Sequence, residues 1–330
     1  MNYINKNLRY YTRMFCGKLL KNNQFALTIY NSVFILVNKK RFIKELKIRE
    51  QLSITDYTHL SSNLPFVPIE QTKDSNYYGY LHIIKMYAST NITDWSIEHG
   101  LMFGDYIPYS YSCKTIRKII TFSEIRAKFL RNTLNKQVSP IGPYIHYASP
   151  ILDDITFKSL KKQFGKTLLF FPSHSSVEEI ASNNIKHEID IISKIQKEGQ
   201  FQTVLVCMYY LDIQKFDYNT NYERNGFKVV TAGHQLDLNF LRRLKSIIML
   251  SDYTISSSVG TQVGYCIYLK KPHYIIGNHI KKDMPDDYKE ILNSFKYFSP
   301  AITENQYIIA AKYWGFNSIK SPEQLRQFLI

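Results

Sequence analysis

A regular alternation of short apolar segments with longer amphipathic ones, between residues 167 and 276, constrains the fold of this chain most. The apolar runs are nearly continuous, which is typical of strands that are covered on both faces. Strands that alternate with helices predict a parallel sheet between two helical layers. The predicted strands are residues 167–171, 203–209, 228–231, 253–256 and 273–276, and the predicted helices are 176–198, 236–250 and 261–269, with 211–225 as helix or turn.

The first half of the chain is less regular. Its predicted elements are a helix over 1–21, strands over 26–37, 80–86 and 118–122, a basic helix over 39–52, and a helix that Ser123 caps. A segment with two prolines and a glycine, residues 139–144, separates the two halves. For 330 residues we expect two domains, 1–145 and 146–330, with the last helices packing back on the first domain. The predicted fold class is α/β, with two Rossmann-like domains and a cleft between them.

The positive charge is concentrated at the beginning of the chain. Residues 1–49 hold eleven Lys or Arg residues and one Glu, a net charge of +10 out of +15 for the whole chain. Such a surface attracts anionic lipid or nucleic acid, or is simply a solvated face. No nucleic-acid-binding signature accompanies it, so nucleic acid is not an expected partner. The apolar stretch 25–37 is too short to span a bilayer, and no signal-peptide cleavage site follows it. We expect a cytoplasmic protein that is peripheral on the inner face of the cytoplasmic membrane through residues 1–49.

The cysteines and the common motifs argue against a bound metal. Cys16, Cys113, Cys207 and Cys266 form no CxxC pair, which indicates free thiols in a reducing compartment. The sequence has no phosphate-binding GxxxxGK[ST], no GxGxxG after a strand, no HExxH and no DxD pair. We therefore predict neither a metal nor a cofactor.

Polar clusters follow the predicted strands at the edge where ligands bind in open α/β sheets. Residues His174, Ser175 and Ser176 open a helix, whose free N–H groups and dipole favour an anion. The serines also suit plain N-capping, which leaves His174 unexplained. We predict that all three contact phosphate.

A second cluster follows the fourth predicted strand. Ser257, Ser258 and Thr261 carry hydroxyls that can donate to phosphate or ribose, and Gly260 allows close approach of the backbone. After the third strand, His234 either faces the same crevice or lies in a surface loop. We predict a phosphate-binding site made of both clusters.

The first half offers a candidate catalytic group in a loop with two glycines. Glu98, His99 and Asp105 are titratable, and a histidine can take a proton from an acceptor hydroxyl while a carboxylate orients it. A histidine that is only hydrogen-bonded within its loop is the alternative.

The order of parts from 228 to 277 resembles the donor half of glycosyltransferases with two Rossmann-like domains, the GT-B architecture. The matching parts are a glycine turn at 229–233, a helix over 241–250, a strand over 251–256, a helix that runs on to Lys271-Pro272, and a last strand over 274–276. The His99-Gly100 loop is similar to a His-Gly loop in the acceptor half of some bacterial surface-polysaccharide transferases. The resemblance implies a nucleotide-sugar donor on the second domain and an acceptor on the first.

The loop at 258–262 differs from that of many glycosyltransferases with this architecture. Many retaining members have a glutamate where this chain has Ser-Val-Gly-Thr-Gln at 258–262. The serine-rich loop is more similar to transferases that use CMP- or CDP-activated donors. The resemblance thus implies a metal-independent glycosyltransferase of capsule or lipopolysaccharide synthesis, acting on a surface glycan or a lipid-linked acceptor. The alternatives are a CDP-glycerol or CDP-ribitol type phosphotransferase on the same fold, and a non-catalytic α/β binding module whose serines only cap helices.

Overall fold

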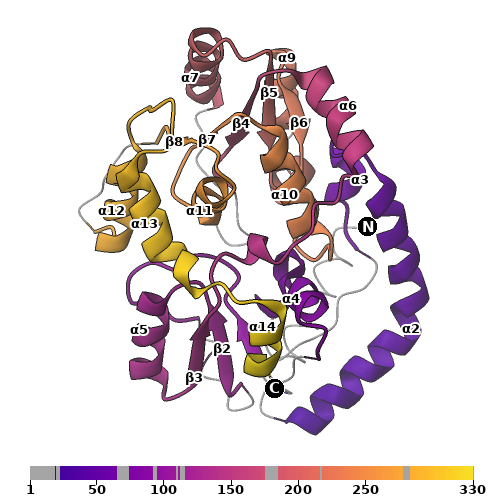
Figure 1. The fold of residues 1–330 in the computed structure, drawn as a ribbon. Coiled ribbons are helices and arrows are strands. Elements are labelled where there is room, and N and C mark those ends of the chain that lie inside the picture. The colour runs from indigo at the N-terminus through magenta and orange to yellow at the C-terminus, as the bar shows by residue number, and fades with distance from the viewer. Residues whose placement is uncertain are drawn as a thin grey trace.

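Two parallel β-sheets, one from each half of the chain, form the frame of the computed structural model (Figure 1). The structure describes residues 19, 23–64, 74–91, 95–108, 111, 116–174, 185–215, 218–277 and 283–329. The α/β class with parallel sheets is confirmed. The predicted helix over 1–21 falls almost wholly outside the described residues.

The larger sheet has five strands in the order β6-β5-β4-β7-β8, and every neighbouring pair is parallel. All five strands lie where the apolar runs predict them, and β4 is buried along its whole length. Their bounds are β4 (Thr167–Phe171), β5 (Thr203–Cys207), β6 (Lys228–Val230), β7 (Tyr253–Ser256) and β8 (His273–Ile275). The helices of this half are α6 (Asp154–Phe164), α7 (Ile185–Glu198), α8 (Tyr210–Lys215), α9 (Tyr218–Arg224), α10 (Phe240–Leu250), α11 (Thr261–Tyr268) and α12 (Asp286–Phe295).

The smaller sheet has three parallel strands in the order β1-β2-β3. They are β1 (Trp95–Ile97), β2 (Lys118–Thr121) and β3 (Gln137–Pro140). The other elements of this half are α2 (Gln24–Gln51), α3 (Tyr57–Ser61), α4 (Tyr80–Ala88) and α5 (Glu124–Leu134), with short 3-10 helices η1 (Asp74–Gly79) and η3 (Tyr144–His146). The Ser123 side chain accepts the N–H of Arg126 and so caps α5, as the sequence predicts.

Two predicted strands of the first half are wrong. Residues 26–37 belong to the helix α2, whose N-cap Asn23 accepts the N–H of Ala26. Residues 80–86 belong to α4, which buries Tyr80, Ile83 and Ile84 at helical spacing. The alternation that predicted a strand over 26–37 does not hold, because apolar residues are spread around α2. In α4 the buried positions follow the spacing of a helix.

The last helices return to the first half of the chain. They are α13 (Glu304–Trp314), the 3-10 helix η4 (Phe316–Ser318) and α14 (Pro322–Leu329), and Figure 1 shows α14 beside the three-stranded sheet. Arg326 Nε donates to the carbonyl of Ala88 at 2.8 Å, and Trp95 Nε1 donates to the carbonyl of Leu329 at 3.3 Å.

Aromatic side chains join the two halves into one core. Phe122, after β2, stacks on Tyr144 with ring centroids 4.1 Å apart, and its ring also lies near Tyr265 of α11. All three side chains are almost completely buried. The predicted division at residue 145 falls at η3, between the two sheets, and stays a prediction. Among the described residues, no helix is long and apolar enough to cross a membrane.

Candidate functional site

Serine hydroxyls from two neighbouring strands meet at the carboxyl edge of the five-stranded sheet. Ser173 follows β4 and Ser258 follows β7, and the Ser173 hydroxyl donates to Ser258 Oγ at 3.1 Å. Because this bond uses the proton of Ser173, the Ser258 proton stays available to a ligand. Ser175 and Ser176, which the sequence assigns to the same site, lie outside the described residues.

Ser257 points to a carboxylate that sequence reasoning missed. Its hydroxyl donates to Glu188 Oε1 at 2.6 Å, and the Tyr222 hydroxyl donates to Oε2 at 2.7 Å. Burial raises the pKa of Glu188, against the opposing effect of these two hydrogen bonds. While Glu188 is ionised, Ser257 has no proton left for a phosphate, so its predicted role as a donor does not fit this geometry.

The N-terminus of α11 lies directly after this serine loop. Its N-cap is Gly260, so no side chain caps it, and the N–H groups of Thr261 and Gln262 donate to no acceptor among the described residues. The free N–H groups and the helix dipole favour an anion at this end. Together with the Ser258 hydroxyl, they can hold a phosphate group.

The His-Gly loop of the first half contacts the same helix end. The backbone N–H of Leu101, two residues after His99, donates to Thr261 Oγ1 at 3.0 Å. Three residues further, the N–H of Gly104 donates to Asp287 Oδ2 of α12 at 2.9 Å. The two clusters that the sequence predicted separately, one in each half, are therefore in contact.

Glu98 belongs to the support of this loop. Its carboxylate is 1% exposed and accepts from Arg126 Nη2 at 2.9 Å and from Thr121 Oγ1 at 2.5 Å. Burial raises the pKa of Glu98, and the Arg126 guanidinium opposes that effect. Arg126 also donates to the carbonyl of Tyr106 at 2.7 Å, so this ion pair fixes both ends of the loop. A buried, doubly paired carboxylate is poorly placed to take a proton from a substrate, while Asp105 is exposed to solvent.

Aromatic rings link the two sides of the candidate site. His174 lies against Tyr209, with ring centroids 4.5 Å apart, and the Tyr209 hydroxyl donates to Gln235 Oε1 at 2.8 Å. On the other side, Tyr77 meets His99 edge-on at 5.5 Å. The N–H of Tyr78, the neighbour of Tyr77, donates to the carbonyl of Gln235 at 2.6 Å. His99 and His174 are thus connected through Gln235 and the tyrosines on either side of it. Rings of this kind offer flat apolar faces on which a base or sugar can stack.

His234 is buried, contrary to the surface-loop alternative. Its Nδ1 accepts the N–H of Leu236 at 3.2 Å, and its ring lies 4.2 Å from that of Tyr210. Burial lowers the pKa of His234 to about 3, so the ring is neutral at physiological pH. The preceding Gly233 has φ +105° and lies within a Cβ's reach of Arg243, which requires glycine at this turn.

A second buried histidine supports the serine loop from behind. His273 of β8 is hydrogen-bonded through Nδ1 to Thr254 Oγ1 at 2.7 Å and through Nε2 to Ser256 Oγ at 3.0 Å. Ser256 in turn donates to the carbonyl of Ser258 at 2.8 Å. Burial lowers the pKa of His273 to about 3. This chain of bonds fixes the backbone that carries Ser258.

Two of the site residues that the sequence prediction missed could have been found from sequence patterns. Tyr209 ends the second predicted strand, so the strand-end rule applied to it as well. Glu188 lies on the apolar stripe of α7 together with Ile192 and Ile195, where a charged side chain is out of place. No local pattern pointed to the role of His273.

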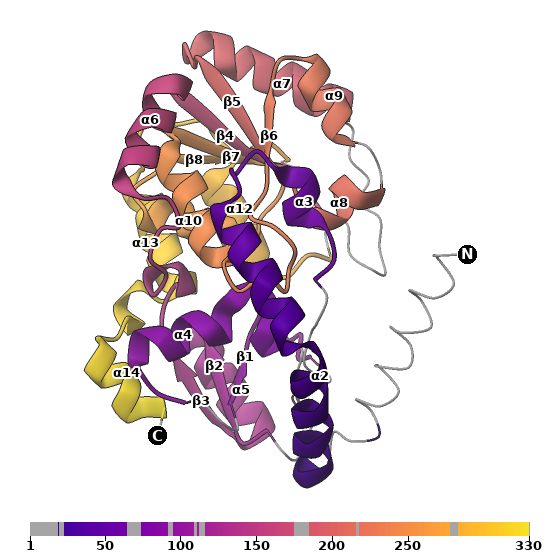
Figure 2. The same ribbon diagram turned by 90° about the vertical axis from the view of Figure 1, so that its right-hand side faces the viewer.

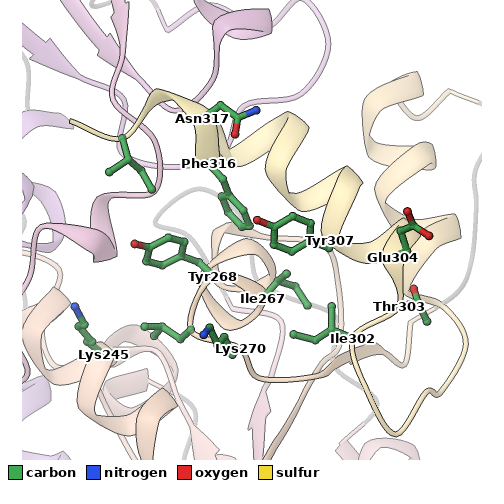
Figure 3. Close-up of a pocket in the computed structure, with 12 residues that line it drawn as sticks. Lys245, Ile267, Tyr268, Lys270, Ile302, Thr303, Glu304, Tyr307, Phe316 and Asn317 are labelled. Carbon is green, nitrogen blue, oxygen red and sulfur yellow. The ribbon is translucent and has the colours of Figure 1, made fainter. Parts of the chain in front are cut away.

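A surface pocket of about 880 Å³ lies away from this edge, between the end of α11 and the start of α13 (Figure 3). Its lining includes the rings of Tyr268, Tyr307 and Phe316, and the amines of Lys245 and Lys270. None of the predicted site residues lines it. Within the described ranges, no group of three or more His, Cys, Asp or Glu side chains is arranged to hold a metal ion.

Comparisons with known proteins give remote structural similarities. No protein-family model and no curated protein matches the sequence. A UDP-GlcNAc 2-epimerase from Methanocaldococcus jannaschii is 11% identical over 65% of this chain, with a TM-score of 0.36. The S. aureus MnaA protein in a co-structure with UDP is 10% identical over 84% of this chain and 84% of its own, with a TM-score of 0.41. A glycosyltransferase from Rickettsia africae is 14% identical over 71% of this chain, with a TM-score of 0.33. The chain spans 61% of the Methanocaldococcus protein and 64% of the Rickettsia protein.

Proposed function

We propose that this protein is a glycosyltransferase that moves a sugar from a nucleotide-activated donor to a bacterial surface glycan or lipid-linked acceptor, at the inner face of the cytoplasmic membrane. The observation that carries the proposal is the contact between Leu101 and Thr261. It brings a loop with a histidine against a helix N-terminus whose first N–H groups donate to no acceptor in the described part of the chain.

The donor diphosphate would bind at the N-terminus of α11. The N–H groups of Thr261 and Gln262 and the hydroxyl of Ser258 are the donors. The Gln262 amide lies beside Gly260 and would turn away to admit the phosphate. Transfer of the sugar leaves negative charge on the departing diphosphate, and preorganised donors stabilise that charge. This set of donors supports a reaction without a metal. His174 and Tyr209 would flank the nucleotide.

The acceptor would lie on the loop that begins at His99. A neutral imidazole can take the proton of an acceptor hydroxyl as the new glycosidic bond forms. Of the three titratable groups that the sequence offers in this loop, Glu98 is paired to Arg126 and Asp105 is exposed. His99 is therefore the proposed base, and Glu98 positions its loop.

Thermal melting with CMP, CDP, UDP, GDP and ADP, with and without EDTA, tests the nucleotide site. A nucleotide at about 100 times its dissociation constant adds roughly 2.7 kcal/mol to the free energy of unfolding. We expect one nucleotide to raise the melting temperature equally with and without EDTA. Ser258→Ala should reduce the shift, whereas Ser159→Ala, an exposed serine on α6, should not.

Two results would count against the proposal. If none of the nucleotides shifts the melting temperature, the serines serve only the hydrogen bonds within their own loops, as in a non-catalytic binding module. If the product of a turnover assay gains the mass of a phosphodiester, the enzyme is a phosphotransferase on the same fold. His99→Ala should abolish turnover while the nucleotide shift persists, because the histidine faces the acceptor.

A further inference from the structure

The helix α2 carries an apolar stripe that the described part of the molecule does not cover. Phe25, Ile29, Val33 and Leu36 follow one another at intervals of three or four residues, so they share one face of the helix. Phe25 is 77% exposed and Leu36 is 81% exposed. Isolated exposed apolar residues are ordinary, but a contiguous stripe on one helix marks an interaction surface.

The same face becomes basic in the second half of the helix. Lys40, Lys44 and Lys47 continue the spacing from Leu36, and all three are exposed. The stripe from residue 25 to residue 47 is about 33 Å long at the helical rise of 1.5 Å per residue. We call these seven residues the α2 stripe.

In the second half of α2, the face opposite the stripe packs against the rest of the protein. Arg49 is completely buried and donates to the carbonyls of Leu60 and Ser62, both at 2.8 Å. The acidic residues of α2 are engaged as well: Glu45 accepts from Arg49, and Glu50 accepts from Arg242. The positive charge of the stripe is therefore not neutralised from within α2. Figure 2 shows the helix along the outside of the molecule, its first half reaching past the three-stranded sheet.

We propose that the α2 stripe binds the surface of an anionic lipid bilayer. Its apolar half would lie among the upper acyl chains, and its lysines would contact the lipid phosphates. The helix lies on the bilayer and does not cross it, in line with its limited apolar length. The inference depends on α2 alone and does not require the nucleotide site.

The charge pattern favours lipid over a second copy of the chain. Two parallel copies that paired along the stripe would bring Lys40, Lys44 and Lys47 against their equivalents. Two antiparallel copies would place the lysines on apolar side chains. An anionic bilayer suits both halves of the stripe, because it offers acyl chains to the apolar residues and lipid phosphates to the lysines.

Vesicle flotation of the full chain tests this proposal. We expect it to float with vesicles of phosphatidylcholine and phosphatidylglycerol, and far less with phosphatidylcholine alone. Lys40→Glu with Lys44→Glu should lower the partition coefficient by at least about 30-fold, because each lost lysine alone accounts for about fivefold near an anionic surface and the new glutamates are repelled. Leu36→Glu should lower it about tenfold through loss of apolar burial.

Matched variants on α6 serve as controls. Ile155 is 84% exposed and lies outside α2, and Lys158 and Lys162 are exposed. Ile155→Glu, and Lys158→Glu with Lys162→Glu, should float like the unchanged protein. All variants should keep the melting temperature of the unchanged protein and any increase that a nucleotide causes. Flotation therefore tests the stripe independently of the proposed nucleotide site.

Three outcomes would overturn the lipid assignment. The first is flotation that the stripe variants leave unchanged, and the second is no flotation with anionic vesicles. The third is a dimer in sedimentation velocity that Leu36→Glu dissociates while the protein does not bind vesicles, which would make the stripe a subunit interface.

Discussion

At the scale of single residues, the direction of each hydroxyl proton decides which serine can serve a ligand. The sequence treats Ser257 and Ser258 alike, because they are neighbours in one loop. In the structure, Ser257 donates to Glu188, whereas Ser258 accepts from Ser173 and keeps its own proton. A hydroxyl has one proton to give, so only Ser258 is ready to donate to a phosphate.

Replacement of Glu188 by Gln should change how stability depends on pH. Burial raises the pKa of Glu188 in the folded protein, so the folded state holds its proton more tightly than the unfolded state. The contribution of Glu188 to the free energy of unfolding is therefore greatest below its ordinary pKa of about 4.3. It decreases as pH rises toward the pKa of the folded state, by at most about 1.4 kcal/mol per pH unit. Glu188→Gln removes this loss. Urea unfolding at pH 5 and pH 7 should show the variant gaining stability relative to the unchanged protein as pH rises.

A constant difference between the two proteins across this pH range would contradict the prediction. It would mean that the hydrogen bonds from Ser257 and Tyr222 hold Glu188 ionised in spite of its burial. Glu198→Gln is a suitable control, since this exposed glutamate ends the same helix.

At the scale of elements, the two halves of the chain differ in how well sequence predicts them. The strands of the five-stranded sheet are apolar runs between turns, and β4 and β7 coincide with their predicted bounds. Residues 26–37 and 80–86 were predicted as strands, whereas the structure has the helices α2, capped at Asn23, and α4, which buries apolar residues at helical spacing. Composition is the weaker signal, because packing on neighbours overrides intrinsic preference.

Gly264→Ala tests the close approach of α11 and α13. A Cβ at Gly264 would lie 2.1 Å from the Trp314 ring, which is completely buried. Overpacking of this kind should lower the free energy of unfolding by about 1–3 kcal/mol. Urea unfolding measures the loss, and Trp314→Leu in the same chain should recover part of it. If the two substitutions are additive, the residues do not press on each other and the packing argument fails.

At the scale of the whole molecule, the candidate site is assembled from segments that are distant in sequence. Leu101 and Thr261 are hydrogen-bonded, and Tyr78 of η1 and Tyr209 after β5 both hydrogen-bond to Gln235. The residue types at the strand ends could be predicted from the sequence because the sheet is parallel. Their partners could not, because the meeting of Glu188 with Ser257, or of Leu101 with Thr261, depends on how the two halves pack.

The buried Arg49 holds the first half of the chain to the second. Besides Leu60 and Ser62, it lies 3.8 Å from Asp237, and its own carbonyl accepts from Arg243 at 3.2 Å. The carbonyl of Leu60 also accepts the N–H of His234 at 2.9 Å, so the same contacts fix the loop after β6.

Arg49→Met should therefore lower the free energy of unfolding by about 3 kcal/mol, because it leaves buried carbonyls without their donor. Arg41→Met, at an exposed position of the same helix, should stay within about 0.5 kcal/mol of the unchanged protein. Hydrogen exchange locates the effect: the amides of α3 and of residues 232–237 should exchange faster together, although they lie in different halves. Faster exchange in α3 alone would show that Arg49 supports only its own neighbourhood, and that the loop with His234 is held by other contacts.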